Sequence, residues 1–340
     1  MKKFKPIFVL VSFLIAITLI IPAILVVPFM DGKASGKLGV DLSKPPAKET
    51  AAPSADAAVT VSVYRSSKGK IENVQLEDYL VGVVAAEMPA DFNEEALKAQ
   101  ALTARTYIVK KMLSKDTTGV PKGAQVTDTT MNQAYESDDK QRADWKADYS
   151  WKHKKILDAV RATSGQILTY KGEAIDATFF STSNGYTENS EDYWQSSIPY
   201  LRSVPSPWDK NSPKFNSKQE FTVSDFEAKL GVKLDKDIGN ITGLTAGKRV
   251  AKVNFNGKIL TGKDIRDKLD LRSADFKWER KGNNIIVTTK GFGHGVGMSQ
   301  YGANGMADEG KNYKDIVKYY YQGVEVTSAE NLFATITAQK

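Results

Sequence analysis

Cysteine is absent from the 340 residues of this chain, and histidine occurs only twice. The missing cysteine excludes disulfides, thiol catalysis and cysteine-ligated metal sites. A metal site built from several histidines is disfavoured too, because two histidines are too few. A folded part of about 280 residues can still bury a stabilising core of its own.

A strong charge of one sign is also lacking. The formal net charge is +7, of which Lys2, Lys3 and Lys5 contribute three, because residues 1–30 contain no Asp or Glu. The remainder of the chain carries only +4, without the concentrated basic stripe of a nucleic-acid-binding protein. The mild excess suits an anionic cell wall or membrane surface, and no nucleic-acid partner is expected.

One long uncharged run stands at the N-terminus. Residues 7–30 are dominated by Ile, Leu, Val and Phe, and about 20 such residues cross the ~30 Å core of a bilayer. A signal peptide has a shorter apolar region followed by a small-residue cleavage site, which residues 34–36 match poorly. Lysines before the run place residues 1–6 in the cytoplasm. We therefore expect one transmembrane anchor, with everything from Asp31 onward outside the cytoplasm.

Composition changes twice after this anchor. Residues 31–58 are rich in Ala, Pro, Lys, Ser and Gly without apolar periodicity, which predicts a flexible linker. Residues 59–335 mix helical and strand periodicity without regular alternation, which predicts one α+β domain. We expect helices over residues 76–88, 93–112, 153–163 and 313–321, strands over 167–170, 175–180 and 285–289, a hairpin over 250–260, and irregular chain over 121–155 and 181–213.

Glu87 is the most informative carboxylate. It follows Leu80 and Val83 on the apolar stripe of the first predicted helix, in the last turn before Pro89. Burial and the negative end of the helix dipole both raise the pKa of a carboxyl placed there. A carboxyl that stays protonated near neutral pH can act as a general acid. The alternative is a buried glutamate paired with Lys98 or Arg105 of the next helix.

Glycosidases usually present a second carboxylate, and the sequence does not single one out. Glu188, Glu191 and Asp192 are possible, since all lie in a polar loop that also carries aromatic residues. One carboxylate suffices if a hydroxyl of the sugar itself replaces water as the nucleophile. The aromatic residues of the same segment could pave a sugar groove or simply cover the core; they are Tyr193, Trp194, Tyr200 and Trp208.

Glycine occupies every second position from Gly291 to Gly297. The run lacks the spacing of a dinucleotide or phosphate loop, and it allows either close approach of an extended polymer or tight packing. His294 lies inside it and is a candidate functional group, whereas His153 falls in a lysine-rich, solvated helix start. A serine hydrolase is disfavoured because no Gly-x-Ser-x-Gly motif occurs.

Three stretches together resemble the SpoIID family. They are Asp78-Tyr-Leu-Val-Gly-Val-Val-Ala-Ala-Glu-Met-Pro89 with Ala96-Leu-Lys-Ala-Gln-Ala-Leu-Thr-Ala-Arg-Thr-Tyr107, then Phe180-Ser-Thr-Ser-Asn-Gly-Tyr-Thr-Glu188 with Asp192-Tyr-Trp194, and Gly291-Phe-Gly-His-Gly-Val-Gly-Met-Ser-Gln-Tyr-Gly-Ala303. The resemblance implies a membrane-anchored lytic transglycosylase with a long substrate groove. Such an enzyme cleaves MurNAc–GlcNAc linkages of denuded peptidoglycan strands during forespore engulfment and leaves 1,6-anhydro-MurNAc ends.

The resemblance also implies a site and partners. It places the catalytic acid/base on Glu87, and the matching substrate-binding positions are Lys98, Gln100, Arg105, Ser181, Thr182, Ser183, Thr187, His294 and Ser299. The implied partners are the amidase SpoIIP and the membrane protein SpoIIM, with the domain on the mother-cell membrane facing the septal space. Some relatives bind zinc through paired cysteines in the region matching residues 126–135; this chain has none, so no metal or cofactor is expected. A non-catalytic wall-binding module that stimulates an amidase is the alternative.

Overall fold

The computed structural model describes residues 59–235 and 237–338. The expected cytoplasmic tip, membrane anchor and linker, residues 1–58, lie outside this part of the chain. Within it, no helix has the length and hydropathy needed to span a membrane. The described residues mix helices with short sheets, so the expected α+β class is confirmed.

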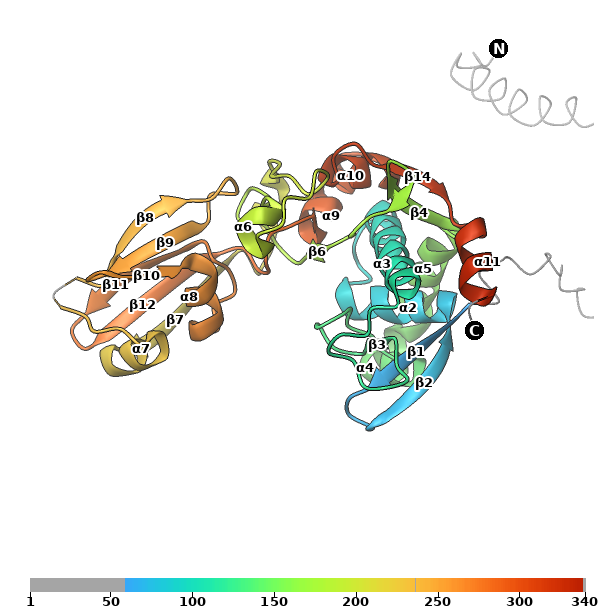
Figure 1. The fold of residues 1–340 in the computed structure, drawn as a ribbon. Helices are drawn as coiled ribbons and strands as arrows, with labels where there is room; N and C mark the ends of the chain where they lie inside the picture. The colour runs from blue at the N-terminus through green and yellow to red at the C-terminus, as the bar shows by residue number, and fades with distance from the viewer. Residues whose placement is uncertain (1–58, 236, 339–340) are drawn as a thin grey trace, which may run out of the picture. The chain divides into compact units, whose positions relative to one another are not determined.

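Buried hydrophobic side chains form two separate clusters. The sequence predicted one domain and did not indicate that it has a second core. The first cluster is formed by elements from both ends of the described chain (Figure 1). In chain order, the elements that precede and follow the second cluster are β1 (Thr60–Arg65), β2 (Lys70–Gln75), α2 (Leu76–Glu87), α3 (Glu94–Ser114), β3 (Val126–Thr127), α4 (Asp138–Trp145), η3 (Lys146–Asp148), α5 (Tyr149–Ala162), β4 (Gln166–Tyr170), β5 (Glu173–Ala174), β6 (Phe179–Phe180), α6 (Ser190–Trp194), η4 (Pro207–Asn211), β13 (Met298–Ser299), α9 (Gln300–Asp308), α10 (Tyr313–Tyr320), β14 (Glu325–Ser328) and α11 (Glu330–Ala338).

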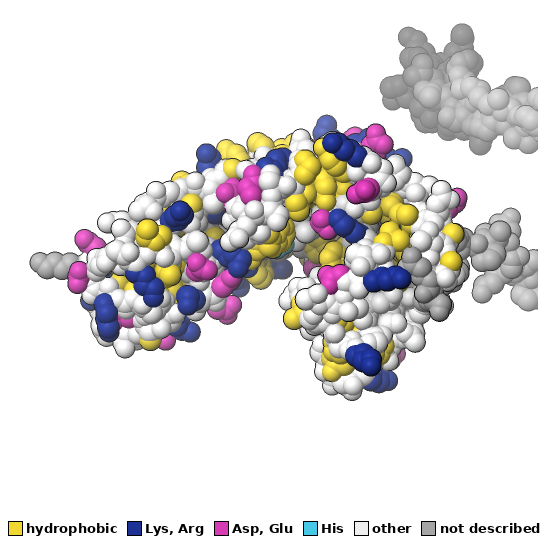
Figure 2. All heavy atoms as spheres, in the orientation of Figure 1, with side chains coloured by type: hydrophobic (Ala, Val, Ile, Leu, Met, Phe, Trp, Pro, Cys, Tyr) yellow, Lys and Arg dark blue, Asp and Glu magenta, His cyan; other side chains and the backbone are white. Residues whose placement is uncertain are grey.

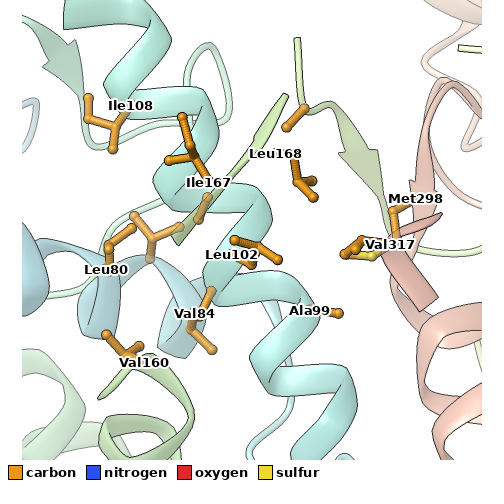
Figure 3. Close-up of a cluster of buried hydrophobic side chains, with 14 of the residues drawn as sticks. Leu80, Val84, Ala99, Leu102, Ile108, Val160, Ile167, Leu168, Met298 and Val317 are labelled. Carbon is orange, nitrogen blue, oxygen red and sulfur yellow. The ribbon is translucent and has the colours of Figure 1, made fainter. Parts of the chain in front are cut away.

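Helix α3 is the central element of the first cluster. Asn93 caps it by accepting a hydrogen bond from the Glu95 amide, and Glu94 and Glu95 place negative charge at its N-terminus. Its buried side chains contact α2, α5, α9, α10 and β4. Figure 3 shows Leu102 of this helix among Leu80 of α2, Val160 of α5 and Ile167 of β4. Because other elements cover α3 on several sides, its apolar side chains are buried all around the helix, which stabilises it.

The second cluster is formed by residues 216–290. Its elements are β7 (Asn216–Thr222), α7 (Val223–Leu230), β8 (Asn240–Leu244), β9 (Val250–Phe255), β10 (Lys258–Thr261), α8 (Gly262–Leu269), β11 (Phe276–Lys281) and β12 (Asn284–Lys290). Two antiparallel sheets, β11-β12-β7 and β10-β9-β8, pack with α7 and α8 around Phe226. The expected hairpin is confirmed, with positive φ angles at Asn256 and Gly257 as a type I′ turn requires.

The chain enters and leaves the second cluster at one place. Asn216 pairs with Lys290 in the register of β7 and β12. One residue further out, the Gly291 amide donates a 2.7 Å hydrogen bond to the Phe215 carbonyl. In the first cluster, β6, which precedes residues 216–290, pairs in parallel with β13, which follows them. Residues 216–290 therefore form an insertion whose two ends lie side by side.

Other sequence expectations meet mixed outcomes. The predicted helices 76–88, 93–112, 153–163 and 313–321 are found, with the third beginning at Tyr149. The predicted irregular chain over 121–155 was wrong in part, because it contains β3, α4 and the start of α5. The predicted strand over 175–180 is only β6 at its end. Ile175 and Ala177 are both buried, which accounts for the alternating apolar pattern in the sequence, but neither belongs to a strand.

Candidate active site

A cavity of about 510 Å³ opens where the end of α2, the loop over residues 130–134, β6 and the glycine-rich run come together. Side chains that line it include Glu87, Tyr107, Trp194 and His294. Of the described residues on its wall, Glu87 is the one that carries a carboxylate. The cavity therefore brings polar and aromatic groups around a single acid.

Glu87 is the last residue of α2, and two groups hold its carboxylate. The Ala134 amide donates to Oε1 at 2.9 Å, and the Gln300 side chain donates to Oε2 at 3.4 Å. Burial raises the pKa of Glu87, while these hydrogen bonds and the charge of Lys214 oppose the rise. This is the direction that the helix stripe predicts. A carboxyl with a raised pKa and few donors can give up its proton to a bound molecule.

The alternative pairing of Glu87 with Lys98 or Arg105 is wrong. Lys98 forms ion pairs with Glu94 and Glu95 of its own helix. The Arg105 guanidinium is fully buried and pairs with Glu77 at 3.0 Å, and it also donates to the Thr163 and Val160 carbonyls. Arg105 thus ties α3 to α2 and α5, and Glu87 has no cationic partner within ion-pair distance among the described residues.

Gln300 is held in place by the start of α9. Ser299 caps this helix by accepting a hydrogen bond from the Gly302 amide. The Gln300 side chain then lies between Glu87 and the buried Gln100, whose Oε1 is 3.5 Å from Gln300 Nε2. Gln100, one of the nine predicted binding positions, is therefore linked to Glu87 through the side-chain amide of Gln300.

His294 lies among aromatic rings at the boundary of two cavities. Its ring centroid is 5.7 Å from that of Phe180, 5.6 Å from Tyr193 and 5.2 Å from Trp194. Burial, with the charges of Arg266 and Arg249, lowers the pKa of His294 to about 3. Because Nδ1 accepts the Val296 amide hydrogen at 3.0 Å, the neutral ring carries its proton on Nε2. His294 is thus a neutral polar group at physiological pH.

Ser181 lies on the cavity wall with Glu87 and His294, whereas four other predicted positions lie in buried hydrogen-bond networks. The Ser183 and Ser299 hydroxyls both donate to the buried carboxylate of Asp209. The Thr182 hydroxyl shares a 3.0 Å hydrogen bond with Ser212, and Thr187 Oγ1 bridges the backbone of Arg202 and Val204. These contacts fix the loops that shape the cavity.

The glycine run is packed tightly against β6 and the residues before it. A Cβ added at Gly293 would lie 2.7 Å from the Phe180 Cβ, and one at Gly297 would lie 2.1 Å from the Thr178 carbonyl oxygen. Both glycines also have positive φ, which side chains rarely adopt. Of the two uses of glycine considered above, tight packing is the one that these contacts show.

A second cavity of about 500 Å³ shares Trp194 and His294 with the first. Glu188, Glu191 and Asp192, the three possible second carboxylates, lie on its wall. Burial raises the pKa of Glu188, but the carboxylate is already engaged by Thr245, the Gly247 amide and, at 3.6 Å, Arg249. Glu191 is paired with Arg202. None of the three lines the cavity of Glu87.

Of the predicted aromatic residues, Trp194 lines both cavities and Tyr193 lines the second, while Tyr200 and Trp208 pack against the first core. Covering of the core is confirmed for Tyr200 and Trp208, and a sugar-binding role for Tyr193 and Trp194 stays a prediction. Sequence reasoning missed Tyr107, Asn132, Lys214, Phe292 and Gln300 on the wall of the first cavity. Phe292 and Gln300 stand inside a recognised motif, but Asn132 and Lys214 lie in segments without any pattern.

Charge on the surface follows the expectation from composition. On the face drawn in Figure 2, basic and acidic side chains are interspersed, without a continuous basic stripe. Among residues 59–235 and 237–338, no group of three or more histidine, aspartate or glutamate side chains is arranged to hold a metal ion.

Two proteins called stage II sporulation protein D match the chain along its whole length. One, from Bacillus subtilis strain 168, is 51% identical over 346 residues and covers 100% of both chains. The other, from Bacillus amyloliquefaciens, is 50% identical and covers 99% of this chain and 100% of its own. The chain belongs to the SpoIID family. The family described as "Stage II sporulation protein" matches residues 64–170, which include Glu87 and both helices beside it.

The SpoIID family also connects this chain with a more distant protein. An amidase enhancer from Bacillus subtilis strain 168 is 30% identical over 305 residues, which cover 73% of this chain and 40% of the enhancer.

Proposed function

We propose that this SpoIID family member is a peptidoglycan lytic transglycosylase that acts during engulfment in sporulation. Its substrate is the MurNAc–GlcNAc linkage of denuded glycan strands, and its products end in 1,6-anhydro-MurNAc. The observation that carries the proposal is Glu87, a carboxylate of raised pKa on the wall of a cavity of about 510 Å³ that holds no second acid among its described residues. One acid suits a reaction in which the substrate supplies the nucleophile.

In the proposed reaction, protonated Glu87 gives its proton to the glycosidic oxygen as the bond to the anomeric carbon breaks. The C6 hydroxyl of the same MurNAc attacks that carbon and closes the 1,6-anhydro ring. Ionised Glu87 then accepts the proton of the hydroxyl, so the acid is regenerated without water. The Ala134 amide and Gln300 stabilise the ionised state between the two steps.

Substitution of the acid tests this mechanism. Glu87→Gln keeps the size of the side chain and removes the proton, so we expect release of 1,6-anhydro-MurNAc-ended fragments from denuded strands to fall by about 10²–10⁴-fold. Mass spectrometry of the products from the full-length protein in detergent measures the loss. Glu279→Gln, at an exposed glutamate paired with Lys281, is the matched control and should keep full activity. Undiminished release by folded Glu87→Gln protein would refute the role of Glu87.

A second function is favoured by the similarity to an amidase enhancer. In this alternative the domain binds glycan without cleaving it and stimulates a wall amidase. Incubation of purified strands with the protein alone separates the two, because an enzyme leaves anhydro ends and a binding module sediments with intact strands. The proposed partners are the amidase SpoIIP and the membrane protein SpoIIM, and the proposed place is the mother-cell membrane, with residues 7–30 as the anchor.

A further inference from the structure

Two cationic side chains, those of Lys214 and Arg272, lie against the ring of Phe292, which lines the cavity of Glu87. The Lys214 Nζ atom lies 5.7 Å from the centroid of that ring, and the Arg272 Cζ atom lies 5.3 Å from it. Phe292 and Lys214 both line the cavity. The two cations come from segments 58 residues apart in sequence, since Lys214 precedes β7 and Arg272 precedes β11. Lys214 and Phe292 flank the two ends of the insertion, and Arg272, inside the insertion, is joined to the same loop by its backbone.

Neither cation is neutralised within the part of the chain that the structure describes, because no carboxylate there forms an ion pair with Lys214 or Arg272. By contrast, Arg249 is paired with Glu188 and Arg202 with Glu191. The positive charge of Lys214 reaches Glu87, whose pKa it lowers against the larger effect of burial. Two unneutralised cations at one ring on the cavity wall can attract and bind an anion there.

The backbone around this pair is fixed rather than loose. Phe292 and Thr182 exchange two hydrogen bonds of 2.7 and 3.0 Å, and the Gly291 amide donates to the carbonyl of Phe215. The Gly293 amide donates to the Arg272 carbonyl at 2.9 Å, which joins the second cation to the same loop. The backbone from which Phe292 and Arg272 project is therefore set by the fold, as a preorganised binding site requires.

We propose that Lys214 and Arg272, the two cations at the ring of Phe292, bind the lactyl carboxylate of a MurNAc unit beside the cleaved linkage. In a denuded strand this carboxyl is free and negatively charged. Attachment of a stem peptide converts it into an uncharged amide, which offers the two cations no charged acceptor. Recognition of this one group would make the protein select denuded strands. The inference rests on the proposed function and adds the residues that determine substrate choice.

Binding measurements test the inference apart from catalysis. All variants carry Glu87→Gln so that strands stay intact, and affinity is measured for denuded glycan and for the same glycan with its lactyl carboxyls chemically reduced to alcohols. We expect the parent protein to bind the denuded strands about tenfold more tightly or better, as loss of one charge-assisted hydrogen bond implies. Lys214→Gln with Arg272→Gln should bind both strands equally and weakly.

Two controls make the result specific. Lys218→Gln with Lys277→Gln removes the same charge from exposed positions on β7 and β11 and should keep the preference. Lys214→Arg with Arg272→Lys keeps both charges and should keep it too. A parent protein that binds both strands equally, or binds neither, overturns the inference, as does a preference that survives Lys214→Gln with Arg272→Gln. Failure of the proposed function would show separately, as the absence of 1,6-anhydro-MurNAc ends when protein with Glu87 intact is incubated with denuded strands.

Discussion

Two carboxylates, the partly buried Glu87 and the buried Glu188, differ in what surrounds them. Burial raises the pKa of both. Glu188 is held by a hydroxyl, an amide and the guanidinium of Arg249, so its charge is neutralised within the protein. Glu87 receives one amide and one weak side-chain hydrogen bond and lines a cavity. The proton of Glu87 is therefore the one that a bound molecule can take.

The raised pKa of Glu87 has a consequence for stability. A carboxyl that binds its proton more tightly in the folded state stabilises that state less and less as pH rises from its ordinary pKa of 4.5 through the raised folded value. Glu87→Gln removes the titration, so the variant should melt at a higher temperature than the parent at pH 7–8. Each unit of pKa shift adds about 1.4 kcal/mol to this difference.

Thermal unfolding at a series of pH values measures the effect. The two proteins should converge as pH falls below about 4.5, where Glu87 is protonated in folded and unfolded chains alike. Glu279→Gln, at an exposed position, should follow the parent throughout. A difference in melting temperature that is absent at pH 8, or that grows towards low pH, would contradict a raised pKa at Glu87.

The sequence predicted Glu87 because the signal is local. Leu80, Val83 and Glu87 lie on one stripe of one helix, so burial of the carboxyl follows from helical spacing. The groups that hold it come from elsewhere, Ala134 from a loop and Gln300 from α9. Lys214 reaches the cavity only through the junction of the insertion. Contacts between such distant segments have no periodic pattern that a single sequence could display.

At the scale of elements, α2 is joined to the cavity loop through Gly82. The Glu136 amide donates to the Gly82 carbonyl at 3.1 Å, and a Cβ at this glycine would lie 2.3 Å from the Tyr135 ring and 2.6 Å from the Glu136 carbonyl oxygen. The same loop supplies the Ala134 amide to Glu87. The close approach of loop and helix therefore sets the position of a donor to the acid.

Gly82→Ala should reveal this packing. In an exposed helix interior, replacing Gly by Ala stabilises by about 1 kcal/mol, whereas overpacking at a buried contact costs about 1–3 kcal/mol. We expect destabilisation of that size and reduced glycan cleavage, because the loop must move away from Glu87. Urea unfolding and product release measure the two effects. Gly243→Ala, whose Cβ would have an ordinary 3.8 Å contact, is the control; a stabilised Gly82→Ala protein would refute the argument.

Elements with strong local signals were predicted from the sequence. The helix starting at Asn93 has a cap and acidic first turn, and the hairpin at Asn256-Gly257 has its turn dipeptide. Several helices were missed, namely α4, α6, α7, α8, α9 and α11. α4 is short and polar and has one buried residue, Gln141, so no apolar stripe marks it. β6 has two residues and exists through its pairing with β13, more than 100 residues away.

At the scale of the whole molecule, the insertion of residues 216–290 is the feature that the sequence did not show. Its apolar residues form a cluster of their own, in which Phe226 contacts the rings of Phe221, Phe255 and Trp278. The strands β7 and β12 that begin and end the insertion are paired along their length. A segment with its own core and adjacent ends has the properties of a folding unit.

We therefore expect a fragment of residues 213–292 to fold by itself. Its sheets, helices and aromatic cluster are complete without the first core, and a chain of this size is near the lower limit for independent folding. Far-UV circular dichroism and a cooperative thermal transition measure the outcome. Phe226→Ala in the fragment should abolish the transition, because losing a buried phenylalanine costs about 3–5 kcal/mol, nearly all the stability of so small a unit.

The same argument limits what the fragment can do. Asn184 of the first part bonds the Asp275 side chain, and Glu188 pairs with Arg249, so the fragment exposes Arg249 without its partner. It keeps Lys214, Arg272 and Phe292 but lacks Glu87, so it should retain part of the anion preference and no cleavage. An unfolded fragment would instead mean that the contacts of Asn184 and Glu188 are needed for the second core to form, and that the two clusters fold as one cooperative unit.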